Sequence, residues 1–347
     1  MTKLLKWNSL FKRKQKTSIK YGIYMNIFLF VLLFIIFFIG FHVGQYQLTP
    51  LEVIKTIFGM GSQESNKVLL EIRLPRLVLA CLVGLGMGIA GVVMQNLLHN
   101  DLASPGTLGV SDGSALFVTL YITLIKTKND SPLFLPLLAL LGGILSACLI
   151  FALSWKKGKA LSRTRVIMTG VAMSAVFGAV GTFAMFILDQ NQLEFLQRWQ
   201  SGELWGTEWE YIAILFVWVM IFGSIVYYKS RTLNAINLGY DIAKGLGVNV
   251  VKEFIILAFC AVAISSGAVA FGGNFFFLGL IAPHIARKLV GEDLRLLLPA
   301  SSIIAGIIVL VSDMFVQGID IFANIPTGVI VSVVSVPYFI FLLLKTR

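Results

Sequence analysis

The chain alternates between long apolar runs and short polar or charged segments. Each run is about 17 to 25 residues long, which is the length that a helix needs to cross the hydrocarbon core of a bilayer. The pattern predicts about ten transmembrane helices, at residues 21–44, 76–98, 106–125, 133–155, 164–188, 210–229, 251–271, 274–290, 296–315 and 327–344. The boundary between the seventh and eighth is the least marked, because only Gly272 and Gly273 interrupt the apolar sequence there. We therefore expect an all-α integral membrane protein, with a basic cytoplasmic tail over 1–20 and a single transmembrane domain over 21–347.

Composition and charge support this membrane topology. Of the 347 residues, 57% are hydrophobic and 13% are charged, and a soluble fold could not cover so much apolar surface. When each Lys or Arg is assigned to its nearer membrane face, 21 of the 28 fall on the side of the N-terminus. The positive-inside rule then places both termini in the cytoplasm, N-in and C-in. The net charge of +11 therefore faces lipid headgroups, and no nucleic-acid partner is expected.

Two features mark the predicted outer face. Thr49-Pro50 followed by Glu52 matches an N-cap, a proline at the first helical position and a capping-box glutamate, which predicts a short amphipathic helix over about 50–58. Arg73 and Arg76 flank a proline at the mouth of the second span. Such arginines serve either as interfacial anchors or as a docking pair for an acidic partner outside, and the residues alone leave both interpretations open.

The longest inner loop, residues 230–250, carries apolar side chains in a segment that should face water. They are Leu233, Ile236, Leu238, Ile242 and Leu246. Either the loop folds on a small core of its own, or it presents one or two short helices to a groove on a partner protein. We favour the second interpretation.

Two further stretches near the inner face are irregular. Residues 95–113 are polar and broken by proline and glycine, which is tolerated at membrane depth only against protein or a water-filled path. Residues 271–299 change from apolar to ionic after Pro283-His284, as a helix leaving the membrane would. We expect the ionic part, 287–295, to support a cytoplasmic surface in a structural role.

Several of these segments together resemble a known family. The runs are RLPR at 73–76, QNLL-N-LASPGTLGVS at 95–111, W-SGELWG at 199–206, LGYDIAKGLGV at 238–248 and FLGLIAPHIARKLVGED at 277–293, followed by LLLP, IPTG and VPYFIFLLLK. In this order they are similar to the permeases for iron siderophores, haem and vitamin B12, the membrane-spanning subunits of type II ABC importers. The matching runs extend over nearly all of the chain after Arg73.

The resemblance implies an assembly. Spans two to five and seven to ten would form inverted repeats. A second permease subunit, two copies of a cytoplasmic ATPase and an extracytoplasmic substrate-binding protein would complete an importer in the cytoplasmic membrane of a bacterium. This chain would bind no cofactor itself, since ATP and Mg²⁺ would sit on the ATPase subunits.

The resemblance also implies roles for residues that match the family's motifs. The ATPase-coupling residues would be Leu238, Gly239, Asp241, Ala243, Leu246 and Gly247. Asn100 and Leu102, with Ser162 and Thr164, would close the cytoplasmic end of the path. Arg73 and Arg76 would dock the binding protein.

The chain departs from the family pattern at several positions. Asn100-Asp101 stands in place of Asn-Pro, the residues after Gly291 read Glu-Asp-Leu-Arg in place of Asp-His-Arg, Gln317 replaces an outer arginine, and Asn324 replaces a glutamate. The missing arginine at 317 weakens docking on one side of this subunit. A different partner chain with its own arginine would compensate, so we expect a heterodimer of paralogues.

Other functional classes fit less well. No Gly-x4-Gly-Lys-Ser/Thr motif occurs, so energy must come from another polypeptide. An ion-coupled transporter would bury ionisable groups near mid-bilayer, whereas Asp112, Asp189 and Asp313 lie nearer span ends. An enzyme would need converging catalytic groups, and neither these nor a metal-site spacing of Cys or His is present. We expect a ferric siderophore complex as cargo, with haem or cobalamin as the alternative.

Overall fold

The computed structural model describes residues 19–44, 46, 48–125, 134–155, 162–322 and 324–345, so most of the predicted basic tail lies outside the described residues. Ten helices lie where the ten apolar runs predict them. They are α2 (Ile19–Gly40), α5 (Leu74–Leu98), α6 (Val110–Ile125), α7 (Phe134–Ser154), α8 (Arg163–Met185), α10 (Trp209–Tyr228), α13 (Val250–Gly272), α14 (Leu278–Val290), α15 (Leu294–Gly318) and α16 (Thr327–Lys345). No strand occurs in these described ranges, and the predicted all-α fold is confirmed. Seven of the described helices are long and apolar enough to cross a membrane, and α6 and α16 are shorter apolar helices.

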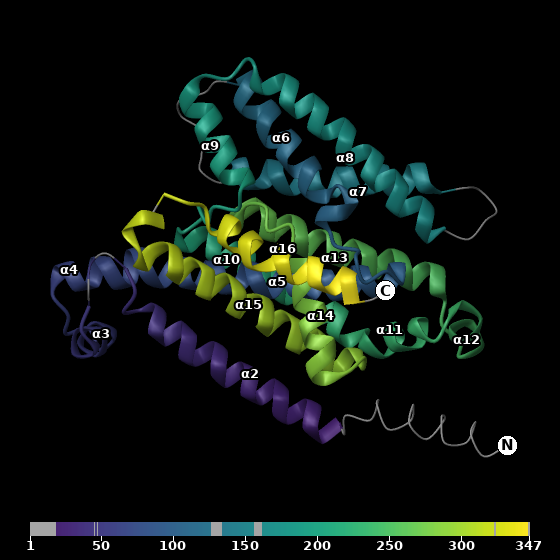
Figure 1. Cartoon of the computed structure of the whole chain (residues 1–347), viewed down its shortest axis with the longest axis horizontal. Helices are drawn as coiled ribbons and strands as arrows, with labels where there is room; N and C mark the ends of the chain where they lie inside the picture. The colour runs from purple at the N-terminus through teal and green to yellow at the C-terminus, as the bar shows by residue number, and fades with distance from the viewer. Residues whose placement is uncertain are drawn as a thin grey trace.

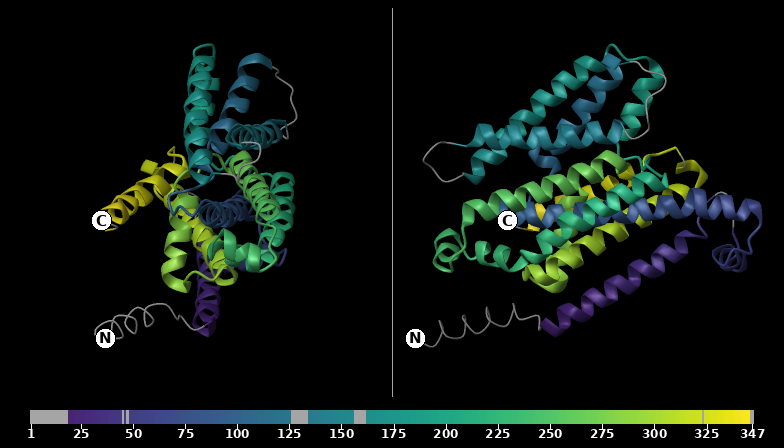
Figure 2. Two further views of the ribbon diagram at one scale, coloured as in Figure 1. Left: turned by 90° about the vertical axis from the view of Figure 1, so that its right-hand side faces the viewer. Right: turned by 180° about the vertical axis from the view of Figure 1, so that it is seen from behind.

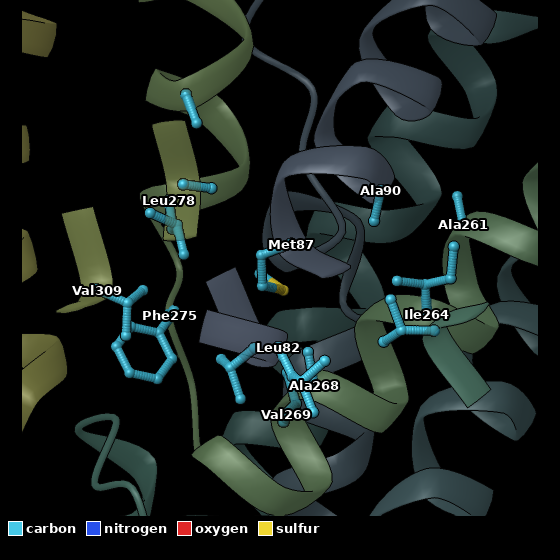
Figure 3. Packing of buried hydrophobic residues seen from close by; sticks show 14 of the residues in the cluster. Leu82, Met87, Ala90, Ala261, Ile264, Ala268, Val269, Phe275, Leu278 and Val309 are labelled. Carbon is cyan, nitrogen blue, oxygen red and sulfur yellow. The ribbon is translucent and has the colours of Figure 1, made fainter. Parts of the chain in front are cut away.

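Helix α5 lies at the centre of the molecule. It packs against α10, α13, α14 and α15 (Figures 1 and 2). Figure 3 shows Leu82, Met87 and Ala90 of α5 among side chains of α13, including Ile264 and Ala268. A helix that is apolar all round is expected to be surrounded in this way by other helices.

Glycines allow the neighbours of α5 to approach closely. A Cβ atom at Gly84 or Gly88 would overlap the backbone of α15, and one at Gly91 would overlap the carbonyl oxygen of Gly279 in α14. Within a membrane, where lipid is as apolar as the side chains, such close backbone packing is a main source of helix association. The hydroxyl of Ser301 in α15 also donates to the carbonyl oxygen of Gly88 at 3.0 Å.

The predicted inverted repeats correspond to α5–α8 and α13–α16. Helix α5 contacts α14 and α15 of the second unit, and α13 contacts α6 and α7 of the first, so exchanging the two units preserves the pattern of contacts. The second and third helices of each unit also pack together, as α6 with α7 and α14 with α15. Because α5 begins at the end of the molecule where α13 finishes, the two units run in opposite directions through the membrane (Figure 1).

Both repeats break between their first and second helices. Helix α5 ends before His99, which has a left-handed backbone (φ 48°), and a short 3₁₀ turn, η2 (Gly106–Leu108), precedes α6. Helix α13 ends at Gly272, and Gly273 (φ 75°) turns the chain into the loop before α14. The expected break at Gly272-Gly273 is therefore present, and α14 is left with only 13 residues.

Short helices cover the two ends of the bundle. One end carries α3 (Pro50–Ile57), α4 (Gln63–Asn66) and α9 (Gln190–Gln200), and the other carries α11 (Ser230–Asn237), α12 (Tyr240–Gly245) and the C-terminus (Figure 1). The predicted capping box of α3 is present: the Thr49 amide donates to Glu52 at 2.8 Å, and the Glu52 amide donates to the Thr49 hydroxyl at 3.3 Å. We call the first end outer and the second inner, following the positive-inside rule.

Candidate functional site

The inner loop 230–250 folds into two short helices with different surroundings. Helix α11 lies against the bundle and buries Leu233 and Ile236 completely. Helix α12 projects beyond it at the inner end (Figure 1). The expectation that all the apolar residues of this loop face a partner was therefore wrong for Leu233 and Ile236, which pack against other helices of this chain.

Three apolar side chains of the loop remain exposed. Leu238, Ile242 and Leu246 are 61%, 54% and 63% exposed, and we call them the inner apolar surface. Ala243 beneath them is fully buried. Clustered leucine and isoleucine side chains at a water-facing tip are unfavourable in isolation and are typical of a surface that a partner covers.

Glycines shape the two ends of α12. Gly239 (φ 114°) precedes the helix and Gly247 (φ 82°) follows it, both in backbone conformations that favour glycine. The Gly247 amide donates to Lys244 and the Val248 amide to Ala243, which closes the helix in a left-handed C-terminal turn. The tip is therefore a compact turn of helix held at a defined angle to α11.

Helix α11 is fastened to the bundle by asparagine side chains. Asn234 donates to Asp293 at 2.8 Å and accepts from the Leu294 amide at 3.0 Å, and Asn237 donates to Asn96 of α5 at 2.5 Å. Hydrogen bonds from Arg295 and Asn234 lower the pKa of Asp293 to about 2, so this carboxylate stays ionised at any cytoplasmic pH. Helix α11, which directly precedes α12, is therefore tied to the inner ends of α5 and α15.

The ionic stretch 287–295 also holds the irregular segment that follows α5. Arg287 donates to Asp101 at 2.9 Å and to Gln95 at 3.1 Å. Gln95 in turn donates to the carbonyl oxygens of Asp101 and Leu280. Although the family's proline is absent at Asp101, an ion pair to α14 holds the turn in its place. The structural role expected for 287–295 agrees with these contacts.

The four predicted gate residues lie at the inner ends of their elements. The Asn100 side chain accepts from the Leu102 amide at 2.9 Å, and Leu102 is 44% exposed. Ser162 directly precedes α8, and Thr164 lies exposed in its first turn. Among the described residues, no hydrogen bond joins Asn100 or Leu102 to Ser162 or Thr164. Their role as a gate stays a prediction.

The two outer arginines are held inside the chain. Arg73 ends the π-helical segment η1 (Lys67–Arg73), is 5% exposed, and donates to the carbonyl oxygens of Phe41, at 2.7 Å, and Tyr46. It borders an outer cavity of about 290 Å³ that Tyr46, Arg76 and Gln317 also line. The docking role of Arg73 stays a prediction, and in this conformation only the edge of its side chain meets solvent.

Arg76 forms the most buried ion pair that the structure describes. Its guanidinium donates to both oxygens of Asp313, at 2.9 to 3.2 Å, and Asp313 is fully buried. Gln317 and Thr327 donate to the same carboxylate at 2.8 and 2.9 Å. Sequence reasoning missed this four-residue cluster, because Arg76 lies 237 positions from Asp313 in the chain and Asp313 was considered only as an ion carrier. Docking through Arg76 would require this pair to open.

Fold and inner loop together define the class of protein. A polytopic bundle of inverted repeats that each break between their first and second helices, with an exposed apolar tip on the cytoplasmic side, is the architecture of a transporter subunit that docks another protein.

Comparisons with known proteins give the family. A model of the FecCD transport family matches residues 32–345. The chain is 39% identical to the iron(3+)-hydroxamate import system permease protein FhuG of Bacillus subtilis, over 88% of this chain and 91% of that protein. It is 33% identical to the hemin transport system permease protein HmuU of Yersinia pestis, over 80% of this chain and 83% of that protein. A solved structure of a metal-chelate type ABC transporter, inward-facing, superposes with a TM-score of 0.80 at 27% identity, over 93% of this chain and 99% of that one.

The chain belongs to the FecCD transport family. It is a membrane-spanning permease of an ABC importer, an integral membrane protein that acts with ATPase and binding-protein partners. It is a transport component and not an enzyme, since the ATPase is a separate subunit.

Proposed function

We propose that this permease and a paralogous second permease together form the path for a ferric siderophore complex. The observation that supports this cargo is the 39% identity, over 88% of the chain, to a permease named for iron(3+)-hydroxamate import. Haem and cobalamin are the alternative cargoes, since relatives named for hemin and vitamin B12 transport are 33% and 30% identical.

Energy would enter through the inner apolar surface. Leu238 and Leu246 would seat in a groove of a cytoplasmic ATPase, with Ile242 beside them, while Gly239 and Gly247 set the angle of the tip and the buried Ala243 anchors it. Asp241 is exposed beside them and would add a polar contact at the rim. Two copies of the ATPase would bind ATP and Mg²⁺, and this chain would bind no cofactor.

Closure of the ATPases would then move α12 and α11 as one piece. The hydrogen bonds of Asn234 and Asn237 connect that piece to the inner ends of α15 and α5. The segment 100–102 would move with α5, because Gln95 of α5 donates to the carbonyl oxygen of Asp101, and Arg287 would couple this movement to α14. Asn100 and Leu102 from one side, and Ser162 and Thr164 from the other, would open and close the cytoplasmic mouth.

Cargo would arrive from an extracytoplasmic binding protein at the outer face. Arg73 would supply positive charge at the outer cavity, and Arg76 would do so if its pair with Asp313 opened. Gln317 lines the same cavity where the family pattern has an arginine. A second permease with an arginine at the corresponding position would supply the positive charge that Gln317 lacks, which supports a heterodimer.

Transport assays distinguish the cargo. Cells that depend on this permease and its partners are expected to accumulate ⁵⁵Fe supplied as a hydroxamate siderophore, and to lose that uptake when the permease is deleted. Haem and labelled cobalamin serve as parallel substrates. Uptake of either of these, with no uptake of the ferric hydroxamate, would contradict the siderophore assignment while leaving the permease assignment intact.

Docking at Arg73 gives a second prediction. Arg73→Glu is expected to weaken capture of the purified binding protein by about tenfold or more, because a charge contact becomes a repulsion. The exposed Lys67→Glu, in the same η1 segment, is the matched control. Because Arg73 also binds two backbone carbonyls, the thermal stability of each variant is measured alongside. Unchanged affinity in a correctly inserted Arg73→Glu protein would exclude docking at this residue.

A further inference from the structure

A groove of about 870 Å³ lies on the outside of the bundle at its inner end. Helices α5 and α10 form its upper wall, and the start of α11 with Arg295 of α15 forms its lower wall. Its volume is that of a small-molecule site. Nothing in the coupling or docking mechanism uses this groove.

The groove changes from apolar to polar along the membrane normal. Its upper part is lined by Leu85, Ile89, Val219, Met220 and Gly223, at the depth of acyl chains. Its lower part is lined by Ser224, Tyr227, Tyr228, Ser230, Arg231, Thr232 and Arg295, beside the cytoplasmic end of α10. Tyrosines at this level are typical of the headgroup region of a bilayer. The gradient matches a molecule with an apolar tail above and a polar head below.

The polar end is positively charged. Arg231 and Arg295 are both exposed, and the described residues that line the groove include no carboxylate. Arg295 also forms an ion pair with Asp293, to which it donates at 2.6 Å. Arg231 forms no ion pair with any residue that the structure describes. A guanidinium with free donors, flanked by hydroxyl groups, suits a phosphate oxygen.

The groove opens towards lipid. Met220 and Tyr228 of α10, which both line the groove, are 52% and 86% exposed. A ligand could therefore enter from the inner leaflet.

We propose that this groove binds the headgroup of an anionic phospholipid of the inner leaflet, with a phosphodiester at Arg231 and Arg295 and an acyl chain along α5 and α10. Basic pockets between spans on the cytoplasmic side recognise such headgroups. The bound lipid would lie against Arg295 and the first turn of α11, and so against the piece that transmits motion from the ATPase.

The test measures lipid retention by the full-length permease, purified with its accompanying subunits and placed in phosphatidylcholine nanodiscs doped with phosphatidylglycerol. Native mass spectrometry is expected to show phosphatidylglycerol retained over phosphatidylcholine. Arg231→Gln is expected to lower retention about fivefold, and Arg231→Gln with Arg295→Gln further, since each cation near the surface contributes on that scale. Lys252→Gln, an exposed cation at the same membrane face outside the groove, is expected to change nothing.

A second variant tests the apolar half without altering charge. Gly223→Phe adds a ring where a Cβ would meet Ile89 at an ordinary 3.4 Å, so it should fold and fill the groove. Lower phosphatidylglycerol retention in this variant supports the acyl-chain placement. Equal retention in the wild type and in both the Arg231→Gln and Gly223→Phe variants would overturn the proposal. Displacement of the retained phosphatidylglycerol by millimolar inorganic phosphate would also overturn the proposal. A cross-link from Ser224→Cys to the second permease would do the same.

Discussion

Uptake is expected to fall to background when Leu238 and Leu246 are both replaced by aspartate. Each side chain is more than 60% exposed, so the permease should still fold and insert. Buried apolar anchors at an interface contribute about 2 kcal/mol or more each, and a charge in their place adds a desolvation penalty. The affinity for the ATPase is therefore expected to drop roughly a hundredfold or more. Co-purification of the ATPase and siderophore-stimulated ATP hydrolysis measure the effect.

Milder variants of the same tip distinguish the loss of an interface contact from a change in the fold of the tip. Leu246→Met keeps an apolar side chain of similar size and is expected to retain uptake. Gly245→Ala and Gly247→Ala form a matched pair: both positions face open space, but only Gly247 has a left-handed backbone (φ 82°). Only Gly247→Ala is expected to distort the tip, because a side chain in this left-handed conformation costs about 1–2 kcal/mol. Wild-type co-purification of the ATPase with the double aspartate variant would refute coupling through this surface.

The second large effect is expected at the buried ion pair. Asp313→Ala would leave the Arg76 guanidinium without its carboxylate, and Gln317 and Thr327 would each lose an acceptor. Breaking a buried pair by removing one partner costs about 3–5 kcal/mol, because the remaining charge is uncompensated. The thermal midpoint of the purified permease in detergent is expected to fall well below that of Asp320→Ala, an exposed aspartate on the same outer end.

Removing both charges tests that reason. Arg76→Leu with Asp313→Leu leaves no unpaired charge, and it is expected to be more stable than Asp313→Ala alone. If the double variant proves as unstable as the single one, the loss reflects packing at this site and not an uncompensated charge. Retained binding-protein capture in the double variant would also show that Arg76 has no part in docking.

The periodic features of this protein were predictable from the sequence. Ten apolar runs gave the ten helices because a span must satisfy its own backbone hydrogen bonds and match the bilayer thickness, and both requirements are local. The capping box at Thr49 and the break at Gly272-Gly273 were predictable for the same reason, since each depends on neighbouring residues. The sequence predicted that the inner loop presents apolar side chains to a partner. It could not show which of them are exposed, because exposure depends on the helices that pack beneath the loop.

The contacts that hold α11 against the bundle, and the ion pair at the outer end, could not be predicted from the sequence. Asn237 meets Asn96 across 141 positions, and Arg76 meets Asp313 across 237. No local pattern distinguishes an asparagine that holds a helix from one that faces water, or an arginine that docks a partner from one that neutralises a buried carboxylate.

The sequence by itself determined the helices, their orientation in the membrane and the family, because hydropathy, charge bias and motif order are written along the chain. Only the tertiary structure decided that Leu233 and Ile236 are buried while Leu238, Ile242 and Leu246 are exposed. It also decided that Arg76 points inward to Asp313. The physical reason is that burial and ion pairing depend on which helices meet, and glycines such as Gly91 allow that meeting between segments that are distant in the chain.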